Sequence, residues 1–221
     1  MGDFISMDLL FRIAHVLFGV TWIGMLYYFN FVQTEYFKEA EADAKADAIK
    51  KLAPRALWWF RWGAMFTFIT GVVLLIGIRQ SNGIDGYILM GALAGTFMFL
   101  NVWLVIWPKQ QIVLGLKEGD GPSSAAKAGL ASRTNTLLSI PMLLGMMGSP
   151  HGAGNAGSVL DHSNSLVTSS PSLGIWLALI IVVAVEANGL FGKTGPITTI
   201  RGVIHSSIAL AVVLLAVMQL V

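Results

Sequence analysis

The residues best suited to chemistry in this sequence lie near the start of its first apolar stretch. His15 is followed by Gly19 at i+4 and by Trp22 at i+7, so the three residues share one face of a helix. A neutral imidazole can ligate iron, and a glycine one turn later leaves flat space beside it, which a porphyrin requires. The pattern indicates a haem ligand, but a histidine that is hydrogen-bonded to a neighbouring helix would give the same sequence.

A second group of polar residues extends this hypothesis. His151 follows the fourth apolar stretch and is the second candidate for a metal ligand, with an ordinary loop histidine as the alternative. Arg12 lies one turn before His15 and either neutralises a haem propionate or extends to the lipid head groups. Glu186 and His205 lie in later apolar stretches, where polar groups are costly, and are candidates for proton transfer or for hydrogen bonds between helices. A buried carboxylate needs a basic partner or a raised pKa, and His205 or Arg201 could be that partner.

Six apolar segments with almost no internal charge must position these side chains. About 20 apolar residues span a bilayer, and each span must be helical because lipid cannot satisfy backbone N–H and C=O groups. We therefore expect an all-α integral membrane bundle of about six helices, in a single domain over residues 1–221. The expected spans are 9–32, 57–78, 86–107, 134–149, 173–192 and 202–221.

Composition supports a membrane protein and excludes several other classes. The chain is 55% hydrophobic and only 12% charged, about half the charged fraction of a soluble domain. A net charge of +2 gives no reason to expect nucleic-acid binding. The absence of cysteine excludes disulfides, thiolate metal sites and covalent haem attachment. The sequence therefore predicts a partner in the lipid bilayer and a haem of the non-covalent b type.

The distribution of basic residues predicts the orientation. Of the 14 Lys and Arg residues, only Arg12 and Arg79 fall on the side of the membrane that also holds both termini. The positive-inside rule makes the other side cytoplasmic, so we expect a multi-pass protein of a bacterial-type inner membrane with both ends in the periplasm. Segment 33–56 is expected to be a cytoplasmic charged helix or loop that ends at Pro54. Segment 150–172 is expected to be a periplasmic loop rich in glycine and serine.

Several blocks in this sequence, taken together, resemble one family. Residues 15–24 (HVLFGVTWIG) resemble the first-helix motif of the membrane-integral bacterial urate oxidases, and the remaining blocks follow in the order of that family. They are residues 59–62 (WFRW), 95–102 (GTFMFLNV), 106–110 (IWPKQ) and 132–143 (SRTNTLLSIPML), with His151 beyond the last. The first motif is also similar to that of the membrane-embedded, haem-binding protoporphyrinogen oxidases.

This resemblance implies a membrane redox protein that binds b-type haem through His15 and transfers electrons, so the chain could be an oxidoreductase acting on urate. Members of the family carry a C-terminal cytochrome c domain, and none follows Val221, so the electron acceptor would be a separate cytochrome c or another membrane subunit. Thr134 occupies a position that is usually histidine in the family. The alternative is therefore a non-catalytic accessory subunit of a larger respiratory or other membrane complex.

Overall fold

Long apolar helices dominate the computed structural model, which describes residues 6–81, 84–149, 158–160 and 172–221. Five helical segments are long and apolar enough to cross a membrane: Met7–Glu39, Ala42–Gln80, Gly86–Val113, Leu173–Phe191 and Ile200–Leu220. Each overlaps one of the expected spans. The all-α, multi-pass membrane architecture is thus confirmed, and so are five of the six expected spans.

The remaining expected span, 134–149, is the second half of a longer helix. This helix, α7 (Gly121–Gly148), has 28 residues, enough to cross a bilayer, but it is too polar to be recognised as a span by composition. Most of its polar residues are buried inside the protein, among them Arg133, Thr134, Asn135, Thr136 and Ser139. The structure thus supports five membrane-spanning helices and leaves the sixth unconfirmed. α7 is a central helix whose polar side chains are mostly covered by neighbouring helices.

The other elements complete the chain. In chain order they are α1 (Met7–Tyr27), η1 (Tyr28–Gln33), α2 (Thr34–Glu39), α3 (Ala42–Asp47), η2 (Ala48–Leu52), α4 (Ala53–Ser81), β1 (Ile84–Asp85), α5 (Gly86–Leu100), η3 (Asn101–Ile106), α6 (Trp107–Val113), α7, β2 (Ser158–Leu160), α8 (Leu173–Phe191), η4 (Gly195–Thr198) and α9 (Ile200–Leu220). The segments η1, η2 and η3 are π-helices.

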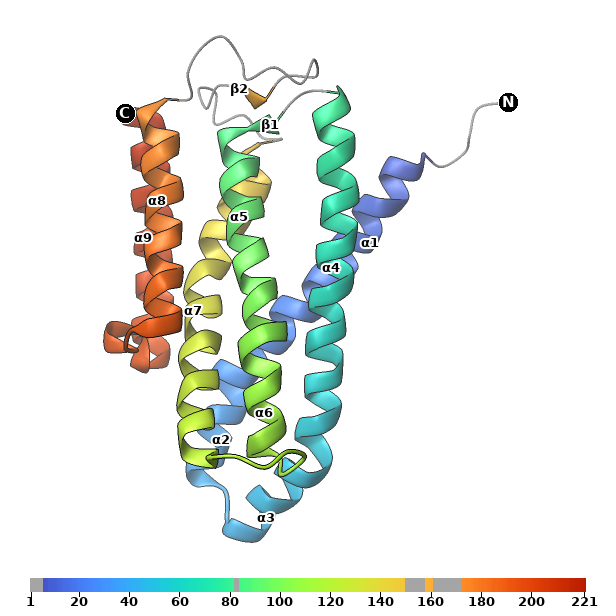
Figure 1. The fold of residues 1–221 in the computed structure, drawn as a ribbon, viewed down its shortest axis with the longest axis vertical. Helices are drawn as coiled ribbons and strands as arrows, with labels where there is room; N and C mark the ends of the chain where they lie inside the picture. Colours follow the sequence, from blue (N-terminus) through green and yellow to red (C-terminus); the bar gives the residue numbers. More distant parts are fainter. Residues whose placement is uncertain (1–5, 82–83, 150–157, 161–171) are drawn as a thin grey trace.

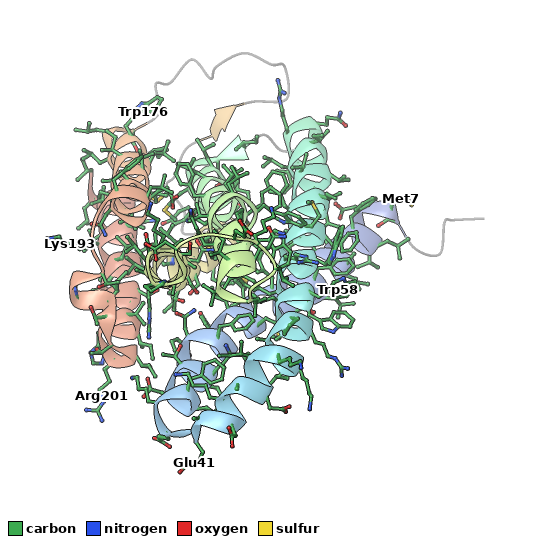
Figure 2. The ribbon with its side chains drawn as sticks, turned by 60° about the horizontal axis from the view of Figure 1, so that its bottom comes forward. Met7, Glu41, Trp58, Trp176, Lys193 and Arg201 are labelled. Atoms are coloured by element: carbon green, nitrogen blue, oxygen red, sulfur yellow. The ribbon has the colours of Figure 1, made fainter. Side chains whose placement is uncertain are left out.

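The long helices run alternately up and down, and α1 crosses the bundle obliquely to pack along α4 (Figure 1). The start of α1, the antiparallel β1–β2 pair and the end of α9 lie at one end, which we call the upper end. The opposite, lower end holds α2, α3, the start of α7 and the turn around η4. Glu41 lies at this end, and Lys193 and Arg201 project outward from the bundle (Figure 2). The charged segment expected over 33–56 is thus helical and lies at the lower end.

Side chains that accept hydrogen bonds fix the beginnings of the long helices. A serine, threonine or aspartate precedes each of five helices and accepts a bond from a free backbone N–H of the first turn, as expected of N-caps. The capping residues are Ser6, Asp85, Asp120, Ser172 and Thr199. These caps reduce the number of unpaired N–H groups at helix starts. Such groups are costly in or near a membrane, where water is scarce.

Pro54 does not end a helix, contrary to the sequence-based expectation. It lies in the first turn of α4, directly after the π-helix η2. Within η2 the backbone N–H of Ala53 bonds to the carbonyl of Ala48, five residues earlier. We infer that this wider turn accommodates the proline, which has no N–H to donate, and lets the chain continue as one helical segment.

A second proline, Pro141, lies inside α7 and requires a compensating bond. Because Pro141 has no N–H, the carbonyl of Leu137 four residues earlier loses its helical donor. The hydroxyl of Ser207 on α9 donates to this carbonyl at 2.7 Å. The break in α7 is therefore satisfied by another helix, which also fixes α9 against α7.

Two glycines allow α5 and α7 to pack in backbone contact. A Cβ on Gly145 would lie 2.5 Å from the Cα of Gly91, and a Cβ on Gly91 would lie 3.0 Å from the Cα of Gly145. Small residues at such crossings are a common means of joining helices in membranes. This contact brings the polar surface of α7 against the centre of the bundle.

We expect Gly145→Ala to destabilise the protein by about 1–3 kcal/mol, because the added methyl group would meet backbone that cannot move aside. Gly129→Ala on the same helix is the matched control, because a Cβ there meets nothing within 4 Å. Thermal unfolding in detergent would compare the two variants. Equal melting temperatures would contradict the proposed close crossing.

Candidate functional site

The side chain of His15, on α1, lies against α4 and is hydrogen-bonded to the backbone of that helix. Its Nδ1 lies 2.9 Å from the carbonyl oxygen of Thr67 and 3.1 Å from the hydroxyl oxygen of Thr70. A carbonyl oxygen can only accept, so Nδ1 carries the proton and donates it to Thr67. In the neutral imidazole, the lone pair is then on Nε2, which has no hydrogen-bond partner among the described residues. Histidine ligands of metals are commonly oriented in this way.

The glycine that lies against the imidazole belongs to α4. A Cβ on Gly71 would lie 2.9 Å from His15 Cε1, whereas a Cβ on Gly19 would contact only Thr67, at 3.9 Å. Trp22 is buried, and its backbone N would lie 3.1 Å from a Cβ on Gly63 of α4. The face shared by His15, Gly19 and Trp22 thus packs along α4, and the absence of a side chain at Gly71 lets α4 approach the imidazole closely.

The other residues expected around His15 are not gathered there. Arg12 pairs with Asp8 at 2.6 Å on the exposed surface of α1, which is the arrangement expected of a side chain extending to the head groups. His151 lies outside the described residues. Within the part of the chain that the structure describes, no group of three His, Cys, Asp or Glu side chains could hold a metal ion. His15 is therefore the one expected ligand whose surroundings are defined.

A second polar site lies in the centre of the bundle and joins three helical segments. The Nδ2 of Asn101 in η3 donates to Asn135 Oδ1 of α7 at 2.9 Å and to Glu186 Oε2 of α8 at 3.0 Å. Asn135 Nδ2 in turn donates to the carbonyl of Met98 at 2.9 Å. All three side chains are buried, so the network brings a carboxyl group into the interior.

The partner of Glu186 is thus an amide rather than a cation. His205 and Arg201, the two basic partners considered from sequence, are both exposed on α9. Asn30 likewise bonds between helices, since its Nδ2 donates to Ser132 Oγ at 2.8 Å. The buried carboxyl group of Glu186, bonded to the amide of Asn101, can link helices and can also hold a proton. The hydrogen bond is compatible with both roles.

Sequence reasoning missed several residues of both sites. Thr67, Thr70 and Gly71 form a small and polar stripe at i, i+3 and i+4 in an apolar span, which marks a face that contacts another helix. Asn135 lies within a run of polar residues that looked like the edge of a short span. Its burial follows from the placement of α7 at the centre, which the sequence pattern does not reveal.

The fold and these sites define a helical membrane protein with one oriented histidine and a buried polar network. Residues 78–160 match the family model described as urate oxidase N-terminal. The match confirms the resemblance to the urate oxidase family over these residues, which include Asn101 and Asn135. His15 and Glu186 lie outside the matched segment. No curated protein and no solved structure matches the chain.

We expect Asn101→Leu to destabilise the fold by about 1–2 kcal/mol, because Glu186 and Asn135 would each lose a buried donor. Glu186→Leu should also destabilise it, and the double variant should cost less than the sum of the two, since the residues share one network. Unfolding of the four proteins in detergent measures this coupling. Strictly additive costs would contradict a shared network.

Proposed function

We propose that this protein is a membrane redox protein that binds b-type haem through His15 and transfers electrons. The observation that carries the proposal is the donation of Nδ1–H to the Thr67 carbonyl, which leaves a neutral Nε2 free to ligate iron. The match to the urate oxidase N-terminal family supports a redox role independently of this geometry.

The residues around His15 fit a haem. The imidazole is half-buried, and the residue packed against its Cε1 edge is Gly71, which has no side chain. Phe18 and Phe66 pack one turn away, with ring centroids 4.9 Å apart, and provide apolar aromatic surface. From the sequence, His151 is the second candidate to hold the haem iron. Arg12, Gly19 and Trp22 complete the proposed binding set, in which Arg12 would exchange its surface ion pair with Asp8 for a haem propionate.

The bound haem would supply one-electron chemistry, and the chain would position it. His15 would hold the iron, while Thr67 and Thr70 fix the orientation and the tautomer of the ring. Electrons would come from a reduced substrate or a quinol, with urate the substrate that the family suggests. They would leave to a cytochrome c or to another subunit of a membrane complex.

The placement in the membrane forms part of the proposal. We infer that α7 is a sixth span, because it is as long as the others and most of its polar side chains are buried. The basic residues at the lower end would face the cytoplasm, and His15 would lie near the periplasmic side of a bacterial-type inner membrane. Glu186 and His205 remain candidates for proton transfer.

A non-catalytic accessory subunit is the second candidate function. The upper half of α1 packs against α4, while large aliphatic side chains along it are exposed. Val16, Leu17 and Val20 are among them, with exposures of 61–68%. Lipid can cover this surface, and so can a neighbouring subunit. Co-purification of folded, haem-free protein with membrane subunits would favour this candidate.

We expect the purified protein to show b-type bands in a reduced-minus-oxidised spectrum and His15→Ala to lose them, because the iron ligand is removed. His205→Ala is the matched control and should keep the bands, since His205 is exposed on α9. A spectrum without bands from folded wild-type protein would contradict the proposal.

A second variant tests the position of the ring without removing the ligand. Gly71→Ala would place a methyl group 2.9 Å from His15 Cε1, so we expect it to lower the haem content of the purified protein. Gly77→Ala on the same helix, where a Cβ meets nothing within 4 Å, should leave the content unchanged. Equal haem content in the two variants would argue against the ring position described above.

A further inference from the structure

Arg133 of α7 is a buried cation with no hydrogen-bond or ion-pair partner in the part of the chain that the structure describes. Its side chain is 9% exposed, and its Nη1 is shielded from solvent without a hydrogen bond. Within the described residues, Arg133 makes no hydrogen bond and no ion pair. Arginine keeps its charge in proteins, and an unpaired buried charge costs several kcal/mol. Such a guanidinium is expected to meet an anion.

An unpaired acceptor lies at the same crossing of helices. Here η1 packs on α7, and Asn30 Nδ2 donates to Ser132 Oγ, beside Arg133. Three residues after Asn30, the Oε1 of Gln33 is also shielded and has no donor. The two contacting segments therefore carry a charged donor and a neutral acceptor that are both unused among the described residues.

The neighbouring charges do not satisfy Arg133. Glu35 is close enough for its charge to attract Arg133, but it forms no ion pair with it and instead pairs with Lys38 at 2.7 Å on the surface. Arg61, by contrast, lies 3.7 Å above the ring of Trp107 and so has an aromatic partner. Of these two arginines, Arg61 has an aromatic partner, whereas Arg133 has no ion-pair or hydrogen-bond partner among the described residues.

We propose that Arg133 binds a small oxyanion at the crossing of η1 and α7, with Gln33 accepting a hydrogen bond from the same ligand. The guanidinium presents paired N–H groups that match carboxylate, phosphate or enolate oxygens. Gln33 Oε1 would select a ligand that also carries an N–H or O–H donor. The basic residues of the lower end would raise the local concentration of such an anion.

This site is distinct from the proposed haem site. His15 lies in the upper half of α1, whereas η1 and the first half of α7 lie toward the lower end (Figure 1). Urate is one anion with both required features, so choosing it as a probe rests on the proposed function. Arg133 itself would recognise any oxyanion of suitable size, including the phosphate of a lipid head group.

The test is the shift in melting temperature of the full chain in an uncharged detergent, with urate, inorganic phosphate or phosphatidylglycerol added in turn and phosphatidylcholine as the lipid control. We expect one of the anions to stabilise the wild type, and Arg133→Met to weaken its binding by about tenfold or more. Without anion, Arg133→Met should be as stable as the wild type or more stable, because an unpaired charge is removed. Arg201→Met, which removes an exposed arginine, is the control and should bind normally.

The possible results either identify the source of the anion or overturn the proposal. Stabilisation by urate or phosphate assigns a soluble ligand, and stabilisation by phosphatidylglycerol alone assigns a lipid phosphate. No shift with any anion would overturn the proposal. So would an equal loss of stability in Arg133→Met and Glu35→Gln, because that result would show that Glu35 is the partner. The haem spectrum of Arg133→Met is a separate readout that should not change.

Discussion

Hydrocarbon offers no hydrogen bonds, and the arrangement of this protein depends on that constraint. The most polar long helix, α7, lies at the centre, where α5, α8 and α9 cover its asparagines, threonines and serines. Asn135 finds its partners on α5 and η3, and the carbonyl freed by Pro141 finds Ser207. The contact between Gly91 and Gly145 brings α5 and α7 close enough for these short side chains to reach.

The same constraint explains the different character of the two polar sites. In the centre, Glu186 accepts a hydrogen bond from Asn101, which also bonds to Asn135, so the network joins three segments. At the edge, α1 packs mainly on α4, and His15 is tied at one nitrogen only. The members of the central network form hydrogen bonds with one another. His15, in contrast, keeps an unprotonated Nε2 with a free lone pair, which a metal ligand requires.

The sequence alone was sufficient for the class of fold and for five helices, because a run of about 20 apolar residues has few stable alternatives in a membrane. It also indicated His15, Gly19 and Trp22 as one helix face, since that follows from helical periodicity. It was wrong about Pro54, which lies in the first turn of α4 after a π-helix, where a missing N–H is tolerated. It left α7 as a short span, since hydropathy cannot distinguish a buried polar helix from a loop.

The tertiary structure decided which side chains meet. Nothing in the sequence connects His15 to Thr67, Asn101 to Glu186, or Ser207 to Leu137, because 52 to 85 residues separate the members of each pair. Local patterns determine the helices, through backbone bonds that lie within each segment. Contacts between helices depend on their order and rotation in the bundle, which follow from the packing of all the helices together.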